Sequence, residues 1–367
     1  MDERREPQRI LMTADTVGGV WTYAIELIRA LPQIEFALAT IGAPITSEQR
    51  AEASRLPNVQ LFPSTYALEW MDDPWREVDR AGDWLLQIAR DFKPSVVHLN
   101  GYAHANLRWP APVLVVAHSC VLSWWAAVKE GDAPRGYDEY RRRVQEGLNA
   151  ADVVVAPTDA MLQSLGENYD WRGDGRMIWN ARDPQLFAPG EKRNAIFAAG
   201  RLWDEAKNLA ALEAAAPHVR WPIEVAGDCS HPNGAELQFR NVHGLGKLPT
   251  DELVARLATS AIYALPARYE PFGLSVVEAA LSGCALVLGD IPTLREVWAD
   301  AAMFVAPDDH VQLATALNLL IDDPASRSDF AERARRRAAE FSPERMAAGY
   351  LTAYRECLTR RTAEVAA

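Results

Sequence analysis

Cysteine is scarce in this chain of 367 residues, which has only Cys120, Cys229, Cys284 and Cys357. The four lie far apart, without the short regular spacing of zinc sites or disulfide frameworks, so reduced thiols are expected. No apolar run approaches the roughly 20 residues needed to cross a bilayer, and the charged N-terminal residues contain no signal-peptide core. The expected protein is therefore soluble and cytoplasmic, without stable membrane insertion.

Positive charge is also in short supply. The chain has 38 lysines and arginines against 50 aspartates and glutamates, a net charge of −12. Nucleic acids select basic surfaces, so a nucleic-acid partner is not expected. The hydrophobic fraction of 49% is ordinary for a globular protein, and the length suits two domains.

Short apolar runs alternate with polar helical segments through the first half of the chain. The expected strands are 36–41, 59–62, 96–99, 113–117 and 153–156, and the expected helices include 79–90 and 137–150. This alternation predicts an α/β fold with a parallel sheet covered on both faces. Functional groups in such sheets lie at the carboxyl ends of strands, where His98 and His118 are expected.

The stretch 268–278 is the most informative part of the second half. An apolar run at 261–265 predicts a buried strand, and 274–282 predicts a helix. Between them, Pro271 and Gly273 prevent regular structure and force a sharp turn. Such a turn directs unpaired backbone N–H groups outward at the positive end of the helix dipole, which favours phosphate or sugar hydroxyls.

Two carboxylates, Glu270 and Glu278, bracket this turn. Both would repel a diphosphate, so we expect them to face hydroxyl pairs, on a ribose and on a hexose. The alternative is that Glu278 only complements the helix dipole and that Glu270 is a solvated turn residue.

Two cations follow another predicted strand at 195–200. Arg201 and Lys207 are six residues apart and come directly after the glycine that ends the run. Charge-assisted hydrogen bonds from two such cations can hold a diphosphate. Two ordinary surface cations are the alternative.

The arrangement of Glu270 and Glu278, with Phe272, Gly273 and Leu274 between them, resembles the donor-binding signature of retaining glycosyltransferases of GT-B fold, family four (glycosyl transferases group 1). The resemblance implies two doubly wound, Rossmann-like domains facing a cleft. It also implies transfer of a hexosyl group from a nucleotide-diphosphate sugar to a hydroxyl acceptor.

The residues 179–183 resemble the family's crossover between domains. The resemblance therefore implies an acceptor domain at 1–185, a nucleotide-sugar domain at 186–345, and a C-terminal helix at 346–367 that packs back on the first domain.

The resemblance assigns roles to the donor-site residues. Glu278 is expected to bind the ribose. The backbone N–H groups of Leu274 and Ser275 are expected to hold the diphosphate with Arg201 and Lys207. No protein nucleophile is evident, so front-face substitution is expected, in which the leaving phosphate takes the acceptor proton. No Asp-x-Asp-like pair lies at this site, so neither a metal nor another cofactor is expected.

Further residues complete the expected site. Glu270, Phe272, Gly273 and His118 are expected to position the hexose, and Lys247 lies in the segment expected beside the nucleotide base.

The acceptor is expected on the first domain. Gly18 and Gly19 match the family's first glycine loop, near the donor phosphates and the acceptor. Trp124 and Trp125 are adjacent, so both cannot face one core. Either one of them forms an acceptor platform or both are packing residues.

Two other functions stay open at this point. A sugar phosphorylase on the same scaffold would use free phosphate, and a non-catalytic protein would only bind a nucleotide sugar. UDP is the first expectation for the nucleotide, followed by GDP or ADP. The sequence motifs identify neither the hexose nor the acceptor.

Overall fold

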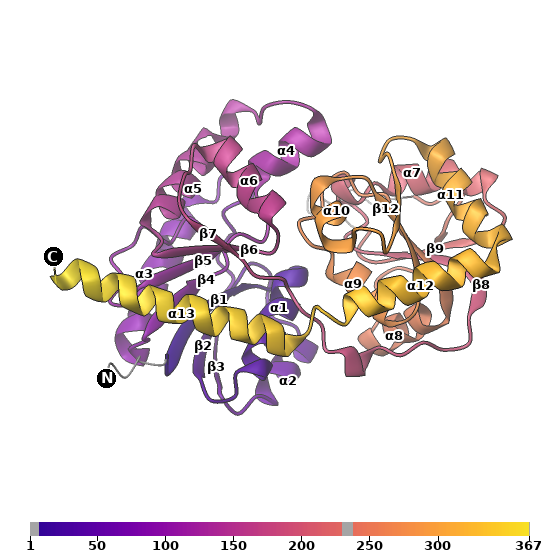
Figure 1. Ribbon diagram of the computed structural model, residues 1–367. Helices are drawn as coiled ribbons and strands as arrows, with labels where there is room; N and C mark the ends of the chain where they lie inside the picture. The colour runs from indigo at the N-terminus through magenta and orange to yellow at the C-terminus, as the bar shows by residue number, and fades with distance from the viewer. Residues whose placement is uncertain (1–6, 230–237, 367) are drawn as a thin grey trace. The chain divides into compact units, whose positions relative to one another are not determined.

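The computed structural model describes residues 7–229 and 238–366, and the chain divides into two compact units (Figure 1). The first unit holds the chain up to Ala126, together with Gly131–Asn180 and the chain from Pro343 onward. The second holds Ala127–Glu130 and Ala181–Ser342. Each unit contains its own parallel sheet covered by helices, which confirms the predicted α/β class.

The first unit is built on a seven-stranded sheet of order β3-β2-β1-β4-β5-β6-β7, with all pairs parallel. Its strands are β1 (Arg9–Asp15), β2 (Glu35–Ile41), β3 (Val59–Pro63), β4 (Val96–Leu99), β5 (Val113–Val116), β6 (Val153–Ala156) and β7 (Gly175–Met177). Strands β4, β5 and β6 are buried throughout, as expected for a sheet covered on both faces. The three-residue edge strand β7 was not predicted, because it has no apolar run.

Helices cover both faces of this sheet. They are α1 (Gly19–Ala30), α2 (Ser47–Ser54), α3 (Trp75–Phe92), α4 (Val121–Lys129), α5 (Asp138–Ala150) and α6 (Asp159–Tyr169). Apolar residues of α3, α5 and α6 join the strands in one core cluster. Leu85, Ile88 and Phe92 illustrate the helical spacing with which α3 meets that core.

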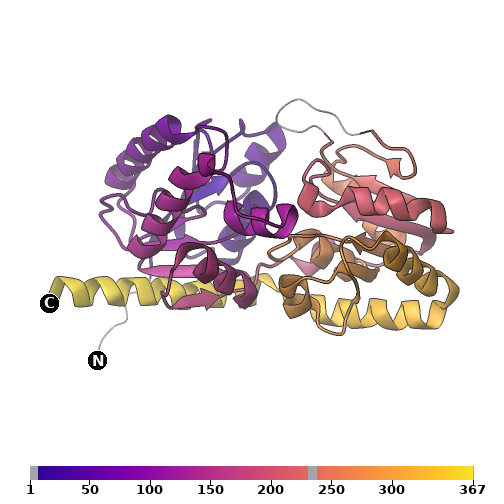
Figure 2. The ribbon, with the colours of Figure 1, turned by 90° about the horizontal axis from the view of Figure 1, so that it is seen from above.

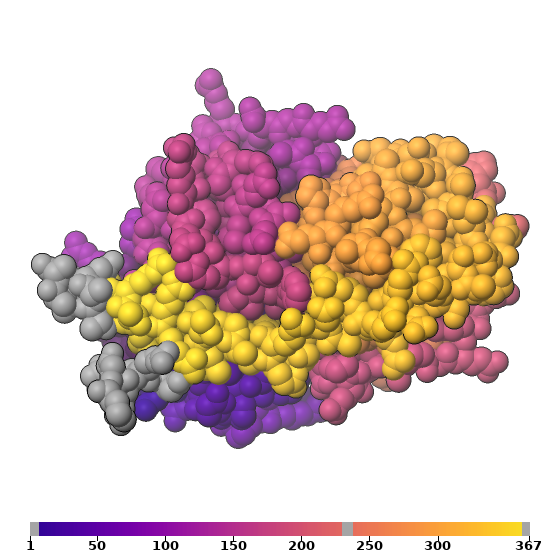
Figure 3. All heavy atoms as spheres, in the orientation of Figure 1, coloured from indigo at the N-terminus to yellow at the C-terminus, as the bar shows by residue number. Residues whose placement is uncertain are grey.

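The last helix of the chain, α13 (Pro343–Ala366), belongs to the first unit. It packs against α1 and against β4, β5 and β6. Figures 2 and 3 show it in yellow, lying along the first unit. Tyr350 and Tyr354 anchor it, and both are fully buried. The helix was expected at 346–367; in the structure it begins three residues earlier, at Pro343.

The second unit has a six-stranded parallel sheet of order β10-β9-β8-β11-β12-β13. Its strands are β8 (Arg193–Ala199), β9 (Ile223–Ala226), β10 (His243–Gly244), β11 (Ser260–Leu265), β12 (Ala285–Gly289) and β13 (Met303–Val305). Its helices are α7 (Leu209–Ala215), α8 (Thr250–Thr259), α9 (Leu274–Leu281), α10 (Pro292–Trp298), α11 (His310–Asp322) and α12 (Pro324–Ala338). Helices α7 and α11 pack together on one side, while α9 packs against α8 and α12.

None of the helices in the described ranges has the length and apolar character needed to span a lipid bilayer.

Candidate functional site

The turn from β11 into α9 has the sharp geometry that the sequence predicted. Gly273 caps the helix with φ 91° and ψ 67°, a left-handed conformation that favours glycine. Phe272, 2% exposed, anchors the turn by packing edge-on against Phe341 at 5.4 Å between ring centroids. The N–H groups of Val276 and Val277 donate to the carbonyl of Gly273.

The two N–H groups before these, on Leu274 and Ser275, have no hydrogen-bond partner within the described part of the chain. The side chain of Ser275 is held by Tyr263, whose hydroxyl is 2.9 Å from Ser275 Oγ and 3.0 Å from the carbonyl of Ala199. Burial raises the pKa of Tyr263, so the phenol stays neutral. This phenol links the end of β8 to the start of α9. The N–H groups of Leu274 and Ser275 remain as two free donors at the edge of the sheet.

Lys207 and Glu270 form an ion pair beside this turn. Lys207 ends a short 3-10 helix after β8, and its Nζ donates to Oε2 of Glu270 at 2.6 Å. Each side chain is 14% exposed. The carbonyl of Glu270 also accepts from Thr293 Oγ1 at 2.6 Å, which fixes the turn from the other side. The sequence assigned Lys207 to the diphosphate and Glu270 to the hexose; the structure brings them into direct contact.

Arg201 lies in the same loop and is more exposed, with 38% of its side chain accessible. Its guanidinium pairs with Asp204 at 3.1 Å and lies 5.6 Å from the ring centroid of Trp203. Asp204 is nearly buried and also accepts from the N–H of Ala206. Sequence reasoning missed Asp204, which orients one cation of the expected clamp.

Glu278 is buried in an ion pair that the sequence did not predict. Its Oε1 lies 2.7 Å from Nε of Arg182, and the two side chains are 11% and 10% exposed. The guanidinium also lies 5.2 Å from the ring centroid of Phe187. Arg182 occurs in the crossover segment 179–183. Only its positive charge could have indicated from the sequence that it pairs with Glu278. A ribose bound by Glu278 would share the carboxylate with this arginine.

Lys247, the residue expected near the base, is exposed. It follows Gly246, whose φ is 66° and whose carbonyl accepts from the N–H of Gly227 at 2.8 Å. Lys247 therefore lies just beyond β10, at the same edge of the sheet as the loops after β8 and β11.

The remaining predicted residues lie in the first unit, at the carboxyl ends of β1 and β5. Gly18 caps α1 with φ 95°, Gly19 is the first residue of that helix, and both are exposed. Trp124 and Trp125 lie on α4, where both are half-buried and meet edge-on at 5.8 Å. Trp125 also contacts Tyr137 at 5.9 Å. An acceptor platform at this pair stays a prediction.

His118 follows β5, and its Nε2 lies 2.8 Å from Oδ1 of Asn100. Tyr23 packs edge-on against its ring at 4.4 Å. Burial lowers the pKa of His118 to about 3, so the imidazole is neutral at pH 7. His98 is fully buried nearby, and its Nδ1 is 2.7 Å from the hydroxyl of Tyr354 on α13.

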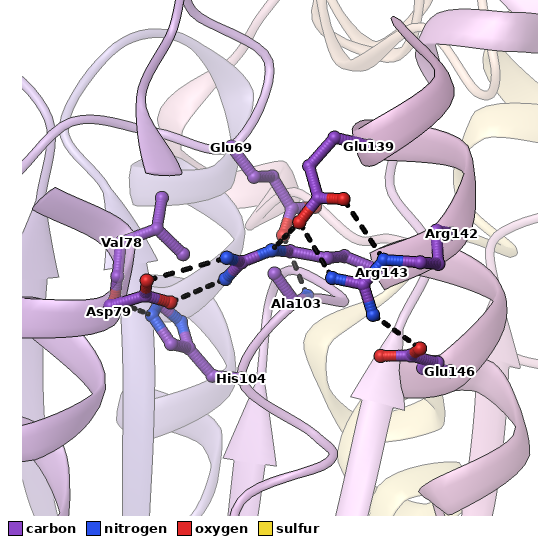
Figure 4. A network of polar contacts seen from close by, with 9 residues as sticks. All are labelled: Glu69, Val78, Asp79, Ala103, His104, Glu139, Arg142, Arg143 and Glu146. Atoms are coloured by element: carbon purple, nitrogen blue, oxygen red, sulfur yellow. Dashed lines mark hydrogen bonds and ion pairs between the residues drawn. The ribbon is translucent and has the colours of Figure 1, made fainter. Parts of the chain in front are cut away.

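A second polar network contacts the loop that follows β4, at Ala103 and His104 (Figure 4). Arg143 of α5 lies between Asp79 of α3 and Glu139. Arg142 and Arg143 lower the pKa of Glu139 to about 2. Glu69 accepts from the backbone N–H groups of residues 102 and 103, and burial raises its pKa. The arginines of this network pair with carboxylates, and Glu69 binds the backbone after β4. The network therefore fixes the loops after β3 and β4.

Acid is expected to destabilise the first unit through His98. Burial, followed by the nearby His118, lowers the pKa of His98 to about 3, whereas an unfolded histidine has a pKa near 6.5. Between these values the unfolded chain binds a proton that the folded chain does not. The contribution of His98 to the unfolding free energy therefore falls as the pH drops below 6.5, by about 1.4 kcal/mol at pH 5.5, in addition to any contribution from His118.

Urea unfolding at pH 7.5 and 5.5, followed by tryptophan fluorescence, measures this loss. The variant His98→Gln is the control, because the contributions of other titrating groups, such as Glu69, cancel in the comparison. Equal pH slopes for both proteins would contradict the prediction.

No group of three or more potential metal-ligating histidine, cysteine, aspartate or glutamate side chains is found within residues 7–229 and 238–366.

Two family models match successive parts of the chain. "Glycosyltransferase Family 4" matches residues 17–186, and "Glycosyl transferases group 1" matches residues 181–337. A curated MMP alpha-(1->4)-mannosyltransferase from Mycolicibacterium hassiacum is 32% identical over 194 residues. That match covers 48% of this chain and 47% of the mannosyltransferase, so it spans about half of each protein.

Solved structures match over nearly the whole chain. Sucrose-phosphate synthase from Thermosynechococcus elongatus has a TM-score of 0.79 at 16% identity, covering 98% of this chain and 100% of that one. The HepE protein of Anabaena, solved in complex with UDP-glucose, has a TM-score of 0.73 at 15% identity, covering 94% and 98%. At these identities the likeness establishes the fold, with its two Rossmann-like domains.

Proposed function

Since the chain belongs to the glycosyl transferases group 1, enzymes of GT-B fold, we propose that it moves a hexosyl group from a UDP-sugar to a hydroxyl acceptor with retention of configuration. The observation that carries the proposal is the set of hydrogen-bond donors and cations at the carboxyl edge of the second sheet. There Arg201, Lys207 and the free N–H groups at the start of α9 follow the ends of β8 and β11. Cations and oriented N–H groups together bind a diphosphate.

The diphosphate site explains the pairing of Lys207. A lysine 14% exposed needs a counter-charge when the site is empty, and Glu270 supplies it at 2.6 Å. When a donor binds, its phosphate oxygens and the carboxylate share the ammonium group, and Glu270 is then placed to accept a hydrogen bond from a sugar hydroxyl. Phe272 and Gly273 hold the turn that sets this geometry.

The proposed chemistry is a front-face substitution. The bond between the anomeric carbon and the leaving phosphate oxygen breaks, and the acceptor oxygen bonds to the same face of that carbon. The acceptor proton passes to the leaving phosphate oxygen. Arg201 and Lys207 stabilise the charge that develops on the diphosphate, which is the largest contribution expected to the rate. With two cations in this role, we propose that no metal is required.

Glu278 and Lys247 complete the proposed nucleotide site. Glu278 pairs with Arg182 and offers acceptor oxygens to ribose hydroxyls. Lys247 lies beyond β10, where backbone groups would contact the base. UDP is proposed because the HepE protein, which shares this fold, was solved with UDP-glucose.

The acceptor is proposed to bind the first unit, near Gly18, Gly19 and the Trp124–Trp125 pair, with His118 contacting the transferred sugar. Gly18 and Gly19 are exposed, so a ligand can approach their backbone closely.

A thermal-shift panel of UDP-, GDP-, ADP- and dTDP-sugars tests this proposal. UDP-sugars are expected to stabilise the protein most, by about 2.7 kcal/mol at 100 times the dissociation constant. The thermal stabilisation and the transfer rate should be unchanged by EDTA. EDTA removes metal ions, whereas the proposed cations are the side chains of Arg201 and Lys207. Stabilisation without transfer to any acceptor would favour the non-catalytic alternative, and loss of the shift in EDTA would contradict metal independence.

A further inference from the structure

Asn100 lies directly after β4, and its side-chain orientation is fixed by Thr13 of β1. The backbone N–H of Asn100 donates to Thr13 Oγ1 at 2.9 Å, and its Nδ2 donates to the Thr13 carbonyl at 2.6 Å. A backbone carbonyl only accepts hydrogen bonds, so the amide group that faces it must be the NH2. The carbonyl oxygen of the Asn100 side chain therefore faces away from Thr13.

That oxygen faces two imidazoles. It lies 2.8 Å from Nε2 of His118 and 3.2 Å from Nε2 of His98. An amide oxygen is only an acceptor, so the Nε2 of His118 must carry a proton. Both rings are neutral at pH 7, because burial lowers their pKa values to about 3. A neutral imidazole has one N–H, so the Nδ1 of His118 is an acceptor.

His98 has a tyrosine hydroxyl beside each ring nitrogen, because the Tyr23 hydroxyl lies 3.2 Å from Nε2 and the Tyr354 hydroxyl lies on the other side of the ring. The Tyr354 hydroxyl lies 2.7 Å from His98 Nδ1 and can donate to it. The titratable groups packed around the two histidines are Tyr23 from α1 and Tyr350 and Tyr354 from α13. Burial raises the pKa of all three phenols, so no charge from them competes with the amide.

His118 Nδ1 differs from His98 Nδ1, because it has no partner among the residues that the structure describes. We propose that Asn100 is a positioning residue that holds His118 as the Nε2–H tautomer, so that Nδ1 accepts a hydrogen bond from a hydroxyl of the transferred sugar. The second half of this proposal rests on the proposed function, in which His118 contacts the hexose.

The tautomer makes His118 selective for a hydrogen-bond donor. A sugar hydroxyl can donate to Nδ1, whereas a carboxylate or a fluorine at the same position presents only an acceptor. Two facing acceptors lose the hydrogen bond and leave both groups desolvated. His118 would thus discriminate between donors by hydrogen-bond polarity, without changing its own charge.

The first test needs no substrate. The full-length protein is labelled with ¹⁵N-histidine, and the His118 signals are assigned by their loss in His118→Ala. Nitrogen–proton correlation spectra at pH 7.5 are expected to show a protonated Nε2 and an unprotonated Nδ1. A protonated Nδ1, or protons on both nitrogens, would overturn the proposal. This result stands or falls independently of any transferase activity.

The second test changes Asn100. Asn100→Leu removes the acceptor at similar volume, so His118 is expected to populate both tautomers and kcat/KM for the UDP-sugar is expected to fall about tenfold. Asn100→Asp retains an acceptor oxygen toward His118 but loses the NH2 that donates to the Thr13 carbonyl, so at pH 8 it should keep the Nε2–H tautomer although the contact with Thr13 is lost. Asn318→Leu is the matched control, because the Nδ2 of this half-buried asparagine of the second unit also donates to a backbone carbonyl.

A Leu variant with the wild-type tautomer would overturn the role of Asn100. An altered tautomer with wild-type kcat/KM would overturn the contact to the sugar. If Asn100→Leu does not fold, the wild-type spectrum still decides the tautomer of His118, because an unprotonated Nε2 cannot donate to Asn100 Oδ1. Absence of turnover in every protein, including the wild type, would instead refute the proposed function.

Discussion

Lys207→Ala is expected to reduce turnover by about 10²- to 10³-fold, the usual cost of removing one preorganised group that stabilises developing charge. Lys207 lies in the loop after β8, where its side chain is 14% exposed. Steady-state kinetics with the best donor from the nucleotide panel measures the loss. Since the ammonium acts mainly on the departing diphosphate, kcat should fall more than KM rises.

The ion pair with Glu270 allows a sharper version of this experiment. In Lys207→Ala, Glu270 keeps its negative charge next to the diphosphate and adds repulsion to the lost attraction. The double variant Lys207→Ala/Glu270→Gln removes that repulsion, so the two effects are expected to be non-additive. Arg220→Ala is the control, because this exposed cation of the same unit pairs only with surface groups. Near-normal turnover in Lys207→Ala would refute the diphosphate assignment.

Glu278→Gln is expected to destabilise the second unit by about 3–5 kcal/mol, because it leaves Arg182 charged and nearly buried without its carboxylate. The two side chains are 10% and 11% exposed, so water screens the charge poorly. Urea unfolding measures the loss. Asp322→Asn breaks an exposed ion pair with Arg220 in the same unit and should cost under about 1 kcal/mol. Similar costs for the two substitutions would contradict the buried-pair interpretation.

The same variant separates the remaining functions. If Glu278 binds ribose, Glu278→Gln should also weaken nucleotide-sugar binding when assayed well below its unfolding temperature. A sugar phosphorylase that uses free phosphate needs no ribose contact, so its activity would survive the substitution under those conditions.

The sequence predicted the strands and helices whose apolar residues are periodic or continuous. The strand–turn–helix at 261–282 is an example, because its apolar strand, its turn residues and its helix all lie within one short stretch. Helix α2 was missed because it is polar. Its capping box between Thr46 and Gln49 is a local signal that could have revealed it.

Partners that are distant in the sequence explain what could not be predicted in the candidate site. Glu278 was recognised, but Arg182 lies 96 residues away and only the folded chain brings them together. Asn100 connects β4 to His118 in the same way. From the chemistry of each residue alone, Lys207 was expected to contact the diphosphate and Glu270 the hexose. Their direct contact with each other depends on the shape of the turn, which the sequence did not specify.

The position of α13 affects the order in which the two units can complete their folding during synthesis. Its tyrosines contact His98 at the centre of the first sheet, yet they are encoded after the entire second unit. A ribosome therefore finishes the second unit before it has made the last helix of the first. Until α13 has been synthesised, β4, β5 and β6 lack the helix that packs against them, so the core of the first unit is completed last.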